Sequence, residues 1–173
     1  MPTTTPAPPR GKPLPPLQIA VCGPHTCTDS EATAAREVGR LLAAAGATVL
    51  CGGGSGVMAA VTEGASGAGG LVLGIRPDTD RDAACPGLSA VIYTNMGEAR
   101  NAILVASADA VIVIGGSWGT LSELALANHR GIPVVSLHGW QVRDADGRAV
   151  DASIPALDPS HAVALALAPP IYP

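Results

Sequence analysis

The sequence predicts an α/β protein: a single Rossmann-like domain in which helices cover both faces of a mostly parallel sheet. Three observations support this prediction. Short runs rich in Val, Ile and Leu alternate along the chain with segments whose apolar residues recur at helical spacing. Glycines directly follow several of these runs, as is common where a strand turns into a helix. The 173 residues, 47% of them hydrophobic and 14% charged, suit one domain with a sizeable core.

The expected elements alternate along the whole domain. Strands are predicted at residues 17–22, 47–51, 71–75, 89–93, 109–114 and 133–137, and helices at residues 28–45, 57–66, 97–106, 121–129 and 159–168. Such alternation favours parallel pairing, because each helix returns the chain to the edge of the sheet from which the next strand starts.

Local signals mark the boundaries in the first half. Thr28, with Glu31 three residues later, is typical of a capping box at a helix start, and Gly46 suits the position after a helix end. Four glycines within residues 52–56 then lead into a helix of small residues that can pack closely on a sheet or a partner helix. A polar loop is expected at residues 76–88.

Boundaries in the second half follow similar signals. The strand at residues 109–114 is continuously apolar, so it is expected to be buried on both faces. Gly131 and Pro133 stop the helix that follows it. The tetrapeptide D-A-D-G within residues 141–150 predicts a polar turn or hairpin, and the prolines at 169–170 end the last helix.

The proline-rich residues 1–16 are predicted to form a flexible tail before the domain at residues 17–173; an arm packed on a neighbouring subunit is the alternative. The tail lacks the apolar stretch of a signal peptide, and no apolar run approaches the ~20 residues that span a bilayer. We therefore expect a cytoplasmic protein without membrane contacts.

Charge and composition limit the kinds of molecule that the protein is expected to bind. The net charge of −4 and the 2% of aromatic residues argue against a nucleic-acid partner. Proteins that bind nucleic acids usually have a basic surface, and those that bind single strands have aromatic side chains on which the bases stack. The low charged fraction suggests buried subunit contacts, so we expect a homodimer or a larger homo-oligomer. Cys22 and Cys27 with His25 between them could be arranged around zinc, but no second Cys/His pair follows, and reduced thiols without a metal are expected.

Two segments share one plan, in which a strand is followed by glycines and then by a helix. They are C-G-G-G-S-G-V-M at residues 51–58 and I-G-G-S-W-G-T-L-S-E at residues 114–123. Glycines let a ligand approach the backbone, and the N–H groups of a helix start favour anions. The alternative is that the glycines only form tight turns. The predicted ligand- and phosphate-binding residues are Gly53, Gly54, Ser55, Gly56, Met58, Gly115, Gly116, Ser117, Trp118, Gly119 and Thr120.

Two charged residues accompany these segments. Glu123 follows one turn after the proposed phosphate site, so its carboxylate would lie near the part of the ligand that one sugar separates from the phosphate. The other explanation is a favourable interaction of this carboxylate with the helix dipole. Arg100, in G-E-A-R-N, suits a phosphate or carboxylate ligand, or else forms a structural ion pair with Glu98 or Glu123. Neither glycine segment is a Walker A loop or a dinucleotide fingerprint.

Gly115, Gly116, Gly119, Thr120 and Glu123 fill a pattern that resembles the P-G-G-x-G-T-x-x-E signature of the Lonely Guy family, long misannotated as lysine decarboxylases. Residues 51–58 resemble that family's G-G-G-x-x-G-L-M segment. The combination of G-E-A-R-N and G-T-L-S-E is more similar to a bacterial Rossmann-like nucleotide-binding branch, which includes proteins similar to an algal molybdenum-cofactor carrier.

The resemblance implies a protein that binds a nucleoside 5′-monophosphate without a required cofactor. If it is an enzyme, the resemblance implies cleavage of the N-glycosidic bond of that ligand, with Glu123 and Arg100 as catalytic residues. The alternative that it implies is a non-catalytic carrier of molybdenum cofactor or a nucleotide sensor. Two departures bear on catalysis: Asn101 stands where the active family has lysine, and Ile114 where it has proline. Lysine decarboxylation is not expected, since Lys12 in the tail is the only lysine and that chemistry usually needs pyridoxal phosphate on a lysine.

Overall fold

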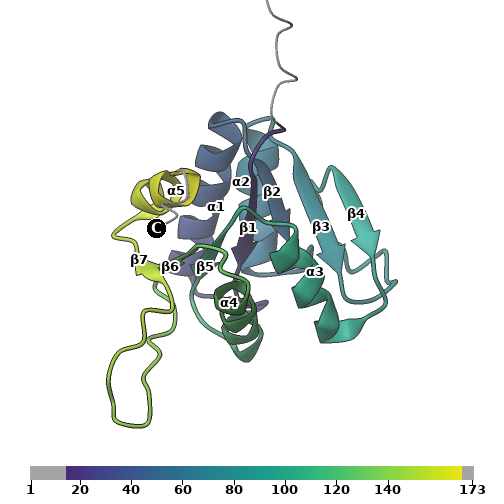
Figure 1. Cartoon of the computed structure of the whole chain (residues 1–173). Helices are drawn as coiled ribbons and strands as arrows, with labels where there is room; N and C mark the ends of the chain where they lie inside the picture. Colours follow the sequence, from purple (N-terminus) through teal and green to yellow (C-terminus); the bar gives the residue numbers. More distant parts are fainter. Residues whose placement is uncertain (1–14, 169–173) are drawn as a thin grey trace, which may run out of the picture.

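The computed structural model describes residues 15–168, which form a sheet of seven parallel strands between two layers of helices (Figure 1). The strands are β1 (Gln18–Cys22), β2 (Thr48–Cys51), β3 (Val72–Arg76), β4 (Ala90–Tyr93), β5 (Ala110–Ile114), β6 (Val134–Leu137) and β7 (Ile154–Pro155). The helices are α1 (Asp29–Ala44), α2 (Val57–Gly67), α3 (Asn101–Ala106), α4 (Trp118–His129) and α5 (Pro159–Leu167), with a 3-10 turn, η1 (Gly97–Arg100), before α3. The predicted fold class is confirmed.

The strand order β4-β3-β2-β1-β5-β6-β7 places a switch at β1. The chain first builds outward from β1 through β2 to β4, and then returns to pair β5 with the other side of β1. Connections on the two sides of β1 therefore diverge at the carboxyl ends of β1 and β5. In open parallel sheets this divergence leaves a crevice in which ligands bind.

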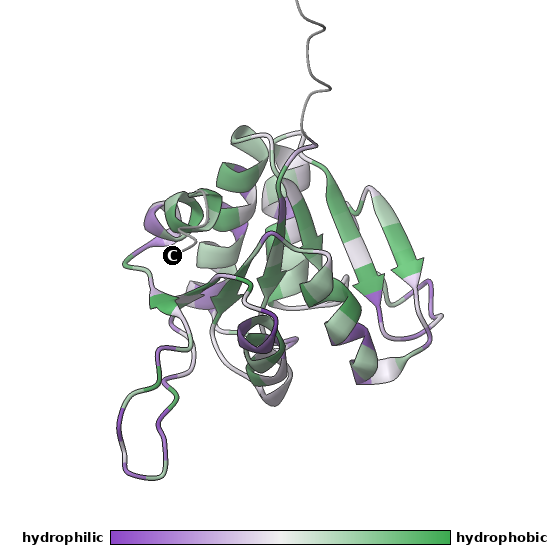
Figure 2. Cartoon of the chain, viewed as in Figure 1, coloured by the Kyte–Doolittle hydropathy of each residue, from purple (hydrophilic) through white to green (hydrophobic). Residues whose placement is uncertain are grey.

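Two apolar layers hold the sheet. Helices α1, α2 and α5 pack on one face and α3 and α4 on the other, so alternate residues of each central strand enter different cores. On β1, for example, Val21 packs toward α1 and α2 whereas Ala20 packs toward α3 and α4. All five residues of β5 are buried, as its continuous hydrophobicity predicts. Figure 2 shows the strands as the most consistently hydrophobic part of the chain.

Helices α1 and α2 approach closely because glycines face the partner backbone. A Cβ on Gly39 would overlap the carbonyl of Val61, and a Cβ on Gly64 would overlap the carbonyl of Arg36. The capping box predicted at the start of α1 is present, with Thr28 and Glu31 each accepting from the other's backbone N–H. The small-residue helix therefore serves helix–helix packing.

Several boundaries differ from the predictions. Helix α4 begins at Trp118 and not at Leu121, because Ser117 caps it through Thr120, so Gly119 and Thr120 belong to its first turn. The segment expected as one helix at 97–106 starts as the 3-10 turn η1. The two-residue strand β7 was not predicted, since it is short and ends in proline.

The predicted hairpin at residues 141–150 is present. It is pinned by an antiparallel bridge between Arg143 and Ala149 and projects from the body of the molecule in Figure 1. The predicted tail at residues 1–16 and the prolines at 169–170 lie outside the described residues, apart from Pro15 and Pro16. None of the helices in residues 15–168 has the length and apolar character needed to cross a membrane.

Candidate functional site

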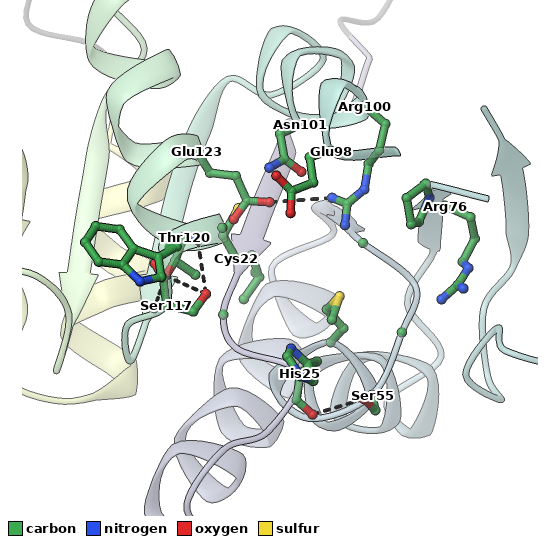
Figure 3. A pocket seen from close by; sticks show the side chains of 18 of the residues that line it. Cys22, His25, Ser55, Arg76, Glu98, Arg100, Asn101, Ser117, Thr120 and Glu123 are labelled. Carbon is green, nitrogen blue, oxygen red and sulfur yellow. Dashed lines mark hydrogen bonds and ion pairs between the residues drawn. The ribbon is translucent and has the colours of Figure 1, made fainter. Parts of the chain in front are cut away.

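A cavity of about 660 Å³ opens at the carboxyl ends of β1, β2, β3 and β5, where the strand order switches. Both glycine segments contribute to its wall, and η1 and the start of α3 cover a further side (Figure 3). The first segment ends at residue 58 and the second begins at residue 114, but the sheet brings their strand ends to the same edge. Nine predicted site residues line the cavity: Gly54, Ser55, Met58, Arg100, Ser117, Trp118, Gly119, Thr120 and Glu123.

The remaining predicted site residues do not line the cavity but shape its wall. Gly53, Gly56 and Gly115 have φ values of 68°, 65° and 68°, which favour glycine. Gly116 lies against the indole of Trp140, whose Nε1 would be 3.0 Å from a Cβ placed there. These glycines fix the turns, and their neighbours form the cavity surface.

Arg100 and Glu123 meet at the inner end of the cavity. Their side chains come from η1 and α4 and form an ion pair of 3.5 Å between Nη1 of Arg100 and Oε1 of Glu123 (Figure 3). Only 13% and 8% of the two side chains is exposed. Nε and Nη1 of Arg100 are buried and have no hydrogen-bond partner within residues 15–168. The guanidinium therefore retains donors that Glu123 does not satisfy.

Glu123 lies in an environment that disfavours its charge. Burial raises its pKa to about 7 from the ordinary 4.5, although Arg100 and the Cys22 thiol act in the opposite direction. Cys22, the last residue of β1, lies beside the Glu123 carboxylate, and burial followed by the charge of Glu123 raises the pKa of the thiol well above its ordinary value. At neutral pH the site thus holds a neutral thiol beside a carboxylate close to its midpoint.

The start of α4 is closed on itself by a second capping box. Ser117 Oγ accepts the N–H of Thr120, and the Thr120 hydroxyl accepts the N–H of Ser117 and donates to its carbonyl. The Thr120 side chain is consequently occupied. Among the described residues, the N–H groups of Trp118 and Gly119 find no acceptor, so these two groups are the donors that the helix start offers to the cavity.

The opposite wall is held by Arg76, which the sequence analysis had assigned to a polar loop. It is the last residue of β3 and is 7% exposed. It binds Asp78 through two nitrogens, and its Nη1 donates to the carbonyls of Gly53 and Ala83. Its charge and most of its donors are therefore used inside the protein. An arginine immediately after an apolar strand, followed by Pro77 and Asp78, is the sequence signal that could have identified it.

Four more lining residues that carry polar or titratable side chains were not predicted as site residues: Cys22, His25, Glu98 and Asn101. Cys22 could have been found as the end of the first strand, at the same edge as both glycine segments. Asn101 is 5% exposed, a polar residue buried next to Arg100 in G-E-A-R-N. Cys22 and Cys27, the suggested zinc pair, pack against opposite faces of the sheet. Within residues 15–168, no three His, Cys, Asp or Glu side chains gather as metal ligands.

The strand order and the cavity define a Rossmann-like protein with a polar cleft at the switch point. The chain belongs to the SLOG cluster4 family, whose model matches residues 16–161. It is 42% identical over 121 residues, 70% of this chain and 80% of the relative, to an uncharacterized protein of Archaeoglobus fulgidus.

Among solved structures, the chain is similar to the molybdenum cofactor binding protein of Rippkaea orientalis, at 32% identity and a TM-score of 0.80, covering 88% of this chain and 96% of that one. It is also similar to the molybdenum cofactor carrier protein of Chlamydomonas reinhardtii, at 30% identity and a TM-score of 0.72, and the match covers 87% of this chain and 95% of that one. These matches confirm the predicted superfamily. DNA processing protein A of Helicobacter pylori, at 19% identity and a TM-score of 0.64, covering 86% and 79%, shares the fold.

Proposed function

We propose that this protein binds a phosphate-bearing, nucleotide-like small molecule in the cavity at the switch point. The observation that carries the proposal is a set of donors around one space that make no hydrogen bond within residues 15–168. They are Nε and Nη1 of Arg100, the second of which is held only by the 3.5 Å ion pair with Glu123, and the backbone N–H groups of Trp118 and Gly119. Buried donors without hydrogen bonds are costly, and an anionic ligand would supply acceptors.

The size of the cavity suits a ligand of this class. Small-molecule sites commonly have volumes of roughly 300–1,000 Å³, and this cavity has about 660 Å³. A nucleoside 5′-monophosphate fits that volume, and so does a phosphorylated pterin such as molybdenum cofactor. The two similar structures that bind or carry molybdenum cofactor support the second ligand.

A second candidate activity is hydrolysis of the N-glycosidic bond of a nucleoside 5′-monophosphate. The pKa of Glu123, about 7, supports it, because a group that titrates near neutral pH can exchange a proton with water or a leaving base. Glu123 contacts Arg100 at 3.5 Å, however, and leaves no ribose-sized gap between the two side chains. Hydrolysis would require Arg100 to move toward the phosphate, so binding is the function that the geometry favours.

The expectations for partners remain part of this proposal. A net charge of −4 favours a small-molecule ligand over a nucleic-acid backbone. We further propose that the protein acts in the cytoplasm, as a homodimer or larger assembly, without a required cofactor.

Calorimetry with AMP, GMP and ribose 5-phosphate tests the proposal, with chromatography of the same mixtures for free base. Gly119→Leu is the informative variant, because a Cβ at Gly119 meets only Ser117 Oγ, at 3.6 Å, and a larger side chain would extend into the cavity. We expect it to reduce the affinity at least about tenfold, equivalent to about 1.4 kcal/mol.

Gly67→Leu is the matched control, since Gly67 is a helical glycine with open space around it and does not line the cavity. It should bind as the wild type does. Equal binding by Gly119→Leu and wild type would place the ligand elsewhere. Free base released by the wild type but not by Glu123→Gln would establish hydrolysis.

A further inference from the structure

The two tryptophans of the chain lie together at the rim of the cavity. Their ring centroids are 5.6 Å apart and their planes are inclined by 37°. Trp118 lines the cavity and is 80% exposed, whereas Trp140 is partly buried and does not line it. In a chain without Phe and with 2% aromatic residues, this is a marked concentration of aromatic surface.

The surroundings hold Trp118 at this position. Its backbone is the first residue of α4, directly after the Ser117 cap. Trp140 donates from Nε1 to the carbonyl of Ser117 at 3.0 Å, which ties the indole behind Trp118 to the same helix start. Gly116 provides the space that Trp140 occupies. The backbone and the supporting ring are thus fixed, while the Trp118 indole is left in contact with solvent.

An exposed indole at the mouth of a polar cavity has a specific use. Planar heteroaromatic rings stack on tryptophan whatever their hydrogen-bonding edges, and each such contact contributes substantially to binding. The backbone N–H of Trp118 is also one of the donors that we propose for the phosphate of the ligand. A ligand with a ring one sugar away from its phosphate can therefore engage the backbone and the side chain of the same residue.

We propose that Trp118 is the residue that recognises the ring of the ligand, and that the site selects phosphorylated compounds carrying a planar heteroaromatic ring over simple sugar phosphates. This inference rests on the proposed function, because it requires a phosphate-bearing ligand in the cavity. It adds a ligand class and a residue that selects it. Trp140 is a positioning residue that supports the indole from behind.

The test compares two probes that share ribose and phosphate but differ in the ring: GMP and ribose 5-phosphate. GMP is chosen because guanine contains the 2-amino-4-oxopyrimidine unit that pterins also contain. Wild type should bind GMP more tightly than ribose 5-phosphate. Trp118→Ala should lose about tenfold or more in affinity for GMP and little for ribose 5-phosphate. Trp118→Tyr, which retains an aromatic face, should recover most of the loss.

Intrinsic fluorescence gives a second readout. Stacking of GMP should quench the emission of the wild type, and ribose 5-phosphate should not. In Trp118→Phe, where Trp140 is the only tryptophan left, the GMP-dependent quenching should disappear although GMP still binds.

The outcomes separate this inference from the proposed function. If neither probe binds the wild type, the proposed function fails and the inference fails with it. If both probes bind but Trp118→Ala weakens them equally or not at all, only the ring-recognition role is overturned. A change in molar mass of Trp118→Ala, with an unchanged preference for GMP, would instead assign the indole to a contact between copies of the chain.

Discussion

The two glycine segments follow the same plan in sequence but use their glycines differently. The last glycine of each segment shows the difference: a Cβ on Gly56 would overlap the Pro24 carbonyl, whereas a Cβ on Gly119 would meet only Ser117 Oγ, at 3.6 Å. The earlier glycines are packed in both segments, since a Cβ on Gly52 would lie 2.7 Å from Nη2 of Arg100 and a Cβ on Gly115 would overlap the Glu31 carboxylate. The two walls therefore differ where their helices start: one is tightly packed there, and the other has room for a ligand.

Helices α2 and α4, which follow the two segments, also differ in the polar residue at one equivalent position. Thr62 and Glu123 each occupy the sixth position of their helix. The Thr62 hydroxyl is fully buried and donates to the carbonyl of Met58 in its own helix, and it also accepts from the Cys85 thiol. Glu123 faces the cavity and depends on Arg100 and Cys22 from other elements. The polar group at this position is thus a hydrogen-bonded neutral hydroxyl in the first helix, and in the second a carboxylate whose pKa is raised to about 7.

The packed helix start in the first segment predicts a large loss of stability at every pH. Gly56→Ala would place a side chain at a φ of 65° and against the backbone of Pro24 and His25. We expect a loss of at least about 2 kcal/mol in the free energy of unfolding, measured by urea denaturation. A loss below about 0.5 kcal/mol would mean that the segment can rearrange, and the contrast between the two walls would disappear.

The carboxylate in the second segment predicts a pH-dependent effect of similar size. Because the pKa of Glu123 is raised from 4.5 to about 7 in the folded state, its stabilising contribution is full below pH 4.5 and is lost as the pH rises to about 7. Glu123→Gln has no carboxyl group to ionise, so its free energy of unfolding should not fall in this way as the pH rises. The free energy of unfolding of the variant minus that of the wild type should therefore increase by about 3 kcal/mol between pH 4.5 and 8.

Urea denaturation of both proteins across that range measures the difference. Thr62→Val is the matched control, since it removes a buried polar group at the corresponding helix position without changing charge, and its difference from wild type should not vary with pH. A constant difference for Glu123→Gln would show that Glu123 ionises normally and is open to water.

The cap of α4 predicts an intermediate effect. Ser117→Ala removes the acceptor for the Thr120 N–H, and loss of such a cap costs about 1 kcal/mol. Helix α2 has no equivalent, because Gly56 at its N-cap makes no side-chain bond. Thermal unfolding of Ser117→Ala should show the loss; an unchanged midpoint would mean that the cap does not distinguish the two helix starts.

The open glycine predicts the smallest effect. Gly119→Ala adds a methyl group in the first turn of α4 where nothing approaches closer than 3.6 Å. Its free energy of unfolding should stay within about 0.5 kcal/mol of wild type. A clear destabilisation, like that expected for Gly56→Ala, would show that the helix starts of both segments are tightly packed.

The sequence predicted the sheet and its helices because their signals are local: apolar runs, helical spacing, the Thr28–Glu31 box and the glycines that follow strands. It also brought Arg100 and Glu123 to the same cavity through the rule that parallel strands end at one edge. It left open whether these residues pair with each other, because that depends on the path of η1. The 3.5 Å contact is a property of the tertiary structure.

The start of α4 could have been placed better from sequence. Ser117 was read as part of a phosphate loop, although a serine three residues before a threonine can cap a helix. Arg76 was harder to interpret, because its partners Gly53, Asp78 and Ala83 lie in three separate segments, and no spacing along the chain brings them together.

The bonds of Arg76 determine how the cavity can respond to an occupant. Arg76 Nη1 and the backbone N–H of Cys85 both donate to the Gly53 carbonyl. These bonds link the loop after β3 to the first glycine segment, so that a movement of one would require a movement of the other. Within residues 15–168, no hydrogen bond ties the Trp118 indole to the cavity wall. A ligand would meet one wall already ordered, at little further loss of conformational entropy, and the rotation of a single exposed side chain could adjust the fit on the other.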